Sequence, residues 1–167
     1  ETDEKVEEYL AIHGRPDAYR PLRVEEGAYY DSCIEIDLSK LEPMAALPFH
    51  PSEAVTLREL IASPGDYLRE VEQRAHEQFG GKAELHLTNK IVNGKLIVDQ
   101  GVIAGCAGGL YDSIYEAASI LKGHTGGCGD YALSVYPGSQ PIMMELVRTG
   151  VIHDLMASGA TVRTAFC

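Results

Sequence analysis

The chain has 167 residues, 45% of them hydrophobic, which is enough for one globular domain with a core of its own. Lysine and arginine number 14 against 25 aspartates and glutamates, and the resulting net charge of −11 argues against nucleic acid or an anionic membrane as a partner. No apolar run approaches the roughly 18 residues that a membrane-spanning helix needs, and no segment resembles a signal peptide. The four cysteines need not be disulfide staples in a chain with a core of this size, and we expect them to be free thiols of a cytoplasmic protein.

The first 52 residues are predicted to form a lead-in segment. Thr2 is placed to cap a helix that runs through about Ile12. The run Tyr29–Leu38 alternates apolar and polar residues, which predicts a half-buried strand. Three prolines in Leu41–Ser52 exclude a regular helix, so this stretch is expected to cross a surface or an interdomain groove.

The next segment, up to residue 100, mixes helices with short strands. Helices are expected near Val55–Ile61 and over Gly65–Gln78, where the apolar residues share one face. Glu84–Thr88 and Leu96–Val98 are typical of strands. The dipeptide Asn93-Gly94 lies between them and favours a tight turn. A small antiparallel hairpin insertion is therefore predicted.

From Gly101 onward the pattern alternates between strands and helices. Strands are expected at 102–104, 132–136 and 160–166, and helices at 110–122, 140–148 and 151–158. Such alternation predicts parallel strands joined by right-handed crossovers. The predicted fold is α/β, with residues 53–167 forming a three-layer α/β/α domain around a mainly parallel sheet.

Two strand-to-helix turns carry the residues of chemical interest. The turn Gly105–Gly109 holds Cys106, and its backbone N–H groups favour an anion or a thiolate. The turn Tyr136–Gln140 places Ser139 as the N-cap of the next helix. A nucleophilic serine would need a base, and no histidine has a spacing that identifies one. The small residues of the first turn are equally compatible with a purely structural role.

The cysteines suggest a metal site divided between distant parts of the sequence. Cys106 and Cys167 each follow a strand-like run, and the carboxyl ends of parallel strands are where ligands bind in such folds. Cys106 and Cys128 are too far apart for a redox CxxC pair or a zinc knuckle. The chain starts at Glu1 without a methionine, so both ends are expected to be cuts in a longer polypeptide.

Several motifs, in order, resemble the aconitase superfamily of iron-sulfur hydro-lyases. They are Ile36–Pro43, Leu47–Pro51, Ile103–Asp112, Pro137–Ser139 and Thr164–Cys167. The first two are similar to the family's segment that leads into its third domain. The third is similar to its Gly-Ser-Cys-Thr-Asn motif, the fourth to its Pro-Gly-Ser turn, and the last to the approach to its Cys-Gly-Pro-Cys motif.

The resemblance implies a function for a longer parent protein. Cys106 and Cys167 would be two ligands of a 4Fe-4S cluster, and the third would lie beyond this chain. The parent would hydrate or dehydrate a small hydroxy-carboxylate, with Ser139 as a candidate substrate-binding residue. The parent's remaining domains would be the partners of this chain, which alone is expected to be inactive and without a cluster. Ala107-Gly108 replaces the family's Thr-Asn, which points to a divergent branch with an altered substrate or to a parent that has lost the standard reaction.

Two other interpretations remain open at the level of sequence. The chain is also compatible with a metal-free α/β module that binds a phosphate or carboxylate at the turns near Cys106 and Ser139. Thiol redox chemistry through Cys106 and Cys128 lacks the CxxC spacing. A cysteine shortly after Cys167 in the parent would favour the cluster over the anion-binding module.

Overall fold

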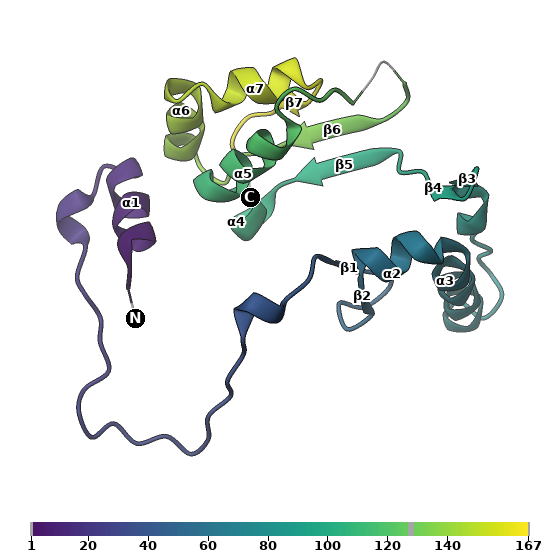
Figure 1. Ribbon diagram of the computed structural model, residues 1–167, viewed down its shortest axis with the longest axis horizontal. Coiled ribbons are helices and arrows are strands. Elements are labelled where there is room, and N and C mark those ends of the chain that lie inside the picture. The colour runs from purple at the N-terminus through teal and green to yellow at the C-terminus, as the bar shows by residue number, and fades with distance from the viewer. Residues whose placement is uncertain (1, 127–128, 167) are drawn as a thin grey trace. The chain divides into compact units, whose positions relative to one another are not determined.

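The computed structural model describes residues 2–126 and 129–166 and divides the chain into two compact units. One unit consists of Glu1–Tyr30 and Asp99–Cys167, and the other is Asp31–Val98. Both are drawn in Figure 1. No helix among the described residues is long and apolar enough to cross a bilayer. The two units divide after Tyr30 and after Val98. The domain boundary expected near residue 52 stays a prediction.

The first unit is built on a parallel sheet of three strands. They are β5 (Gln100–Ile103), β6 (Ala132–Val135) and β7 (Thr161–Val162), in that order across the sheet. The helices α4 (Gly105–Gly108) and α5 (Tyr111–Leu121) connect the first two strands, and α6 (Gln140–Arg148) and α7 (Val151–Ala157) connect the last two. The strand–helix alternation expected from residue 101 is therefore confirmed, as is the α/β fold with a mainly parallel sheet.

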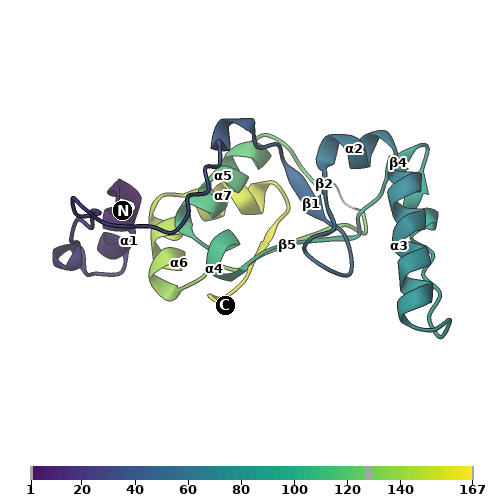
Figure 2. The ribbon, with the colours of Figure 1, turned by 90° about the horizontal axis from the view of Figure 1, so that it is seen from below.

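The core of this unit lies between one face of the sheet and the helices α5, α6 and α7, which Figure 2 shows together beside β5. Its fully buried side chains include Val135 on β6, Ile114 on α5 and Leu146 on α6. Val102 on β5 alternates with the core-facing positions and is 56% exposed. Because α5, α6 and α7 share one face, the second helical layer of a three-layer domain is not seen among residues 2–126 and 129–166.

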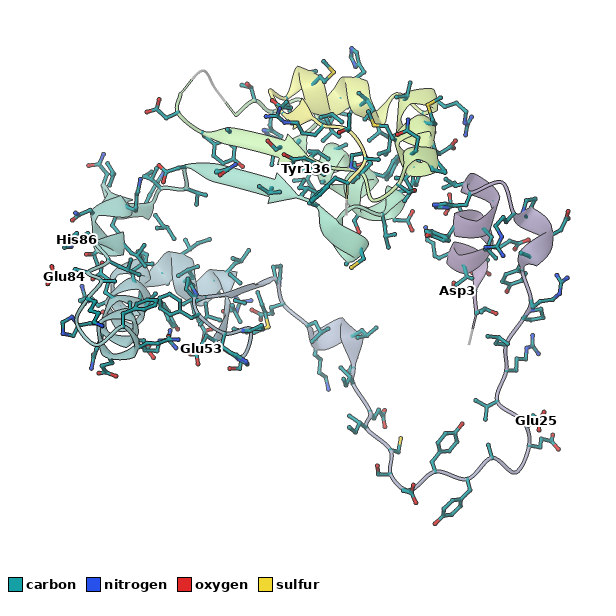
Figure 3. All side chains as sticks on the ribbon, turned by 180° about the vertical axis from the view of Figure 1, so that it is seen from behind. Asp3, Glu25, Glu53, Glu84, His86 and Tyr136 are labelled. Atoms are coloured by element: carbon teal, nitrogen blue, oxygen red, sulfur yellow. The ribbon has the colours of Figure 1, made fainter. Side chains whose placement is uncertain are left out.

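The helix α1 (Glu4–Ile12) begins one residue later than the sequence suggested. Asp3, labelled in Figure 3, is the N-cap, and its carboxylate accepts hydrogen bonds from the backbone N–H groups of Lys5 and Val6 at 3.1 and 3.2 Å. The expected cap, Thr2, instead donates its hydroxyl proton to the Arg20 carbonyl oxygen. A carboxylate is the better partner for the partial positive charge of a helix N-terminus, which explains the exchange.

The second unit combines two small antiparallel pairs with two helices. Strands β1 (Met44–Ala46) and β2 (Ala54–Thr56) pair, and so do β3 (Ile91–Val92) and β4 (Lys95–Leu96). The helices are α2 (Leu57–Ala62) and α3 (Pro64–Gln78). Thr56 and Glu59 form a reciprocal capping box at the start of α2. Glu53, labelled in Figure 3, forms an ion pair with Arg74 of α3.

The turn at Asn93-Gly94 is confirmed, with positive φ angles of 51° and 75° at its two residues. Two predicted strands are wrong. Tyr29–Leu38 pairs with no other strand in the described residues, and Ile34 within it is 86% exposed. Glu84–Thr88 ends in a 3₁₀ helix, Leu87–Lys90, because Glu72 of α3 accepts the Thr88 N–H at 2.8 Å. Both runs have strand-like composition, but pairing depends on a neighbour that composition does not specify.

Candidate functional site

The candidate site lies where the strands of the parallel sheet end. Strand β5 leads into the turn Gly105–Gly109, and β6 leads into the turn Pro137–Ser139. The Gly138 N–H donates to the Gly109 carbonyl oxygen at 2.8 Å, so the two turns are joined through their backbones. The Phe166 N–H donates to the Pro137 carbonyl oxygen at 2.9 Å. The carboxyl ends of all three strands therefore meet at one edge, as the parallel topology requires.

Glycine at position 109 is a requirement of this contact. A Cβ atom placed there would lie 2.6 Å from the Gly105 carbonyl oxygen and 2.8 Å from the Gly138 nitrogen, and both obstacles are backbone atoms. Backbone atoms cannot rotate away as the end of a side chain can. Close packing of the two turns thus explains the glycine at position 109.

Cys106 lies in the first of these turns, in the four-residue helix α4, and is an exposed free thiol. Cys33, in the other unit, is also exposed and free, although the predicted strand would have half-buried it. Cys128 and Cys167 fall outside the described residues. Phe166 is the last described residue before Cys167, and its backbone is tied to Pro137. The described residues contain no cluster of three or more potential metal ligands, so the assignment of Cys106 and Cys167 as ligands stays a prediction.

Ser139 is the N-cap of α6, as predicted, and it has a second partner that the sequence did not reveal. Its hydroxyl oxygen accepts a long hydrogen bond of 3.4 Å from the Ile142 N–H. The hydroxyl also lies 2.9 Å from Nε2 of His13, which follows α1. His13 and Ser139 are 126 positions apart, so no local spacing could have indicated the contact.

Two further contacts surround the two turns. The ring of Tyr136, labelled in Figure 3, packs edge-on against the ring of Phe166, with the centroids 5.9 Å apart. Lys5 of α1 forms an ion pair of 2.9 Å with Asp112 in the first turn of α5. The hydrogen bond that Lys5 donates to the Asp112 carboxylate raises the pKa of Lys5, because it stabilises the charged ammonium. This exposed ion pair links α1 to α5.

The fold is that of an α/β protein with a parallel sheet, a class in which ligands generally bind at the carboxyl ends of the strands. The chain belongs to the aconitase family: the family described as "Aconitase family (aconitate hydratase)" matches it over residues 1–167. This confirms the resemblance drawn from the ordered motifs.

Relatives with a stated activity are large subunits of 3-isopropylmalate dehydratase. Those of Clostridium beijerinckii and Moorella thermoacetica are 29% and 30% identical, each across 99% of this chain. That of Campylobacter jejuni is 30% identical across 89% of it. In each case the matched region is 31% of the relative's own length. The chain therefore corresponds to less than one third of such a large subunit.

Proposed function

We propose that this chain is part of a hydro-lyase that adds water to, or removes water from, a hydroxy-carboxylic acid. The observation that carries the proposal is the family match over the whole chain. The relatives named as dehydratases of 3-isopropylmalate, itself a hydroxy-carboxylate, support this reaction class. The glycine-lined junction of the turns beside Cys106 and Ser139 is compatible with a site for such a ligand.

Cys106 and Cys167 are proposed as two ligands of a 4Fe-4S cluster, with a third cysteine elsewhere in the full-length protein. Cys106 suits this role because its thiol is exposed and unpaired, and thiolates are the usual ligands of iron-sulfur clusters. There is space at Gly108, two residues after Cys106, because a Cβ atom added there would meet only Cγ2 of Ile103, at 4.0 Å. When bound, the cluster supplies a Lewis acid for the departing hydroxyl group.

Within this proposal the chain binds and orients the substrate, and the rest of the protein completes the reaction. Ser139 is the candidate substrate-binding residue, presented by the turn that is hydrogen-bonded to the Cys106 turn. The general acid and base are assigned to domains or a partner subunit outside this chain. The relatives are called large subunits, which supports a small subunit as one such partner. The isolated chain is accordingly expected to be inactive.

The experiment that tests the proposal uses the full-length protein, purified without oxygen. Cys106→Ser and Cys167→Ser should each abolish the visible absorbance of the cluster and the hydratase activity together, because losing one of three thiolates leaves the cluster unsupported. Cys33→Ser is the matched control, since it removes an equally exposed free thiol from the other unit. It should change neither property.

One result would replace the cluster by a metal-free interpretation. If Cys106→Ser retains full absorbance and turnover, the assignment of this residue is wrong. The junction of the turns would then be better explained as an anion-binding edge, because N–H groups at helix starts favour phosphate or carboxylate. Saturable binding of a dicarboxylate to the metal-free protein, measured by calorimetry, would support that second candidate.

A further inference from the structure

The contact between His13 and Ser139 has a direction that its geometry determines. Nδ1 of His13 lies 2.8 Å from the carbonyl oxygen of Tyr9, and Nε2 lies 2.9 Å from the hydroxyl oxygen of Ser139. A carbonyl oxygen only accepts hydrogen bonds, so Nδ1 must carry the proton. In the neutral imidazole Nε2 is then an acceptor, and Ser139 must donate its hydroxyl proton to it.

This donation determines what Ser139 can offer to a ligand. A serine hydroxyl has one proton and two lone pairs. The proton is directed to His13, and one lone pair receives the long bond from the Ile142 N–H. One lone pair remains, and Ser139 is only partly buried. A group that approaches Ser139 must therefore be a hydrogen-bond donor, such as a hydroxyl, and not a carboxylate.

We propose that His13 is a positioning residue that makes Ser139 an acceptor for the hydroxyl group of a hydroxy-carboxylate substrate. The inference rests on the proposed function for its ligand, but its geometric part stands on the described residues alone. His13 is itself held in place, because its ring lies against the ring of Tyr9 with centroids 4.2 Å apart. The role gives α1 a part in ligand selection although it is far from α6 in sequence.

The geometric part is tested on the 167-residue chain by nitrogen NMR of labelled histidines. At about pH 8, long-range correlations distinguish protonated from unprotonated ring nitrogens. His13 should be protonated at Nδ1. Ser139→Ala should shift its Nε2 resonance, because a hydrogen bond to that atom is lost, and leave the tautomer unchanged. A proton on Nε2, or a resonance that Ser139→Ala does not move, would overturn the proposal.

A matched internal control is present in the same spectrum. Nδ1 of His50 lies 2.9 Å from the hydroxyl of Ser52, a contact of equal length that is exposed and local, in the other unit. The resonances of His50 should not respond to Ser139→Ala. A response of both histidines would indicate general disturbance of the fold, and Ser139→Thr, which keeps a hydroxyl, would then be required to restore the Nε2 resonance of His13.

The ligand-selecting part is tested in the full-length protein with two substitutions of different chemistry. His13→Phe keeps an aromatic ring against Tyr9 but has no acceptor, whereas His13→Gln places an amide oxygen where it can accept from Ser139. The measurement is the preference for a hydroxy-carboxylate over the same carboxylate lacking its hydroxyl, from substrate KM and inhibition constants. His13→Phe and Ser139→Ala should each reduce this preference about 3- to 10-fold, as expected for one hydrogen bond.

His13→Gln should retain most of the preference, and the double variant His13→Phe/Ser139→Ala should lose no more than Ser139→Ala alone, because both changes remove one interaction. His50→Phe should have no effect. If the wild-type protein turns over no hydroxy-carboxylate, the proposed function fails while the tautomer result is unaffected. If the protein is active and His13→Phe leaves the preference unchanged, the inference fails and the proposed function stands.

Discussion

Two strand-like runs differ sharply in burial in this molecule. The strand β6 contributes Val135 to the fully buried core of the first unit. The alternating run at residues 29–38 leaves Ile34 86% exposed and without a strand partner in the described chain. Both runs have the composition expected of strands. What differs is that β6 lies between β5 and β7, so both of its edges are paired.

This comparison shows that periodicity indicates a preference for extended structure and says nothing about which sheet would receive it. A strand is stabilised by hydrogen bonds and side-chain contacts with its neighbours. An isolated extended run obtains neither of these. Substitutions in each unit can measure how much burial, close backbone contact, capping and charge contribute to its stability.

The largest expected effect is the contrast between two isoleucines. Ile114→Ala removes a fully buried side chain from the core and should lower the free energy of unfolding of its unit by about 2–5 kcal/mol. Ile34→Ala should change stability by less than about 0.5 kcal/mol, since its side chain is exposed. Urea denaturation of the 167-residue chain measures both. Equal losses would show that the 29–38 run packs against something in solution.

Gly109→Ala should have the next largest effect. The new methyl group would collide with backbone atoms of Gly105 and Gly138, and such overpacking costs about 1–3 kcal/mol. Gly129→Ala is the control, because a Cβ there meets nothing within 4 Å. Thermal unfolding should separate the two variants clearly. A Gly109→Ala protein as stable as the wild type would mean that the two turns are not in contact.

Helix caps should contribute similarly to the free energy of unfolding of the two units. Thr56→Ala removes the capping box of α2, and Ser139→Ala removes the cap of α6, so each should cost about 1 kcal/mol. Thr56→Ser is the conservative control, because it retains a hydroxyl. Chemical denaturation monitored separately for each unit measures these losses. A much larger loss for Ser139→Ala would show that its bond with His13 also holds α1 in place.

The smallest effect concerns pH. The hydrogen bond from Lys122 lowers the pKa of Asp154, because it stabilises the carboxylate. The folded carboxyl then binds protons less readily than the unfolded one, so this contribution to stability is present above the ordinary aspartate pKa of about 3.9 and is lost as pH falls below it. Lys122→Met should flatten the acid limb of the stability profile. An unchanged limb would show that the pair contributes nothing.

Much of the first unit could be predicted because its signals are local. The glycines and prolines that end each strand precede helices with clear apolar faces, so the turns of Cys106 and Ser139 and the helices α5 to α7 were expected near their observed bounds. The cap at Asp3 and the 3₁₀ helix at Leu87–Lys90 were missed, since each depends on competition between neighbouring polar groups.

The contact of His13 with Ser139 was beyond prediction for a different reason. It exists because α1 packs beside α6, and that packing cannot be predicted from the identity of either residue. The same limit explains the 29–38 run, whose partner strand is not specified by its own composition. The sequence predicts that Cys106 and Cys167 follow strands ending at the same edge of the sheet. Only Cys106 lies within the described residues.

The backbone bond between Gly138 and Gly109 has a consequence for how this protein can diverge in sequence. Because the two turns touch through main-chain atoms, the spacing between Cys106 and Ser139 does not depend on the size of any side chain packed between them. Core residues beneath the turns can be exchanged for others of similar volume without altering that spacing. The residues that follow Gly109 and Gly138 can therefore vary with the ligand, while the distance between the two turns stays the same.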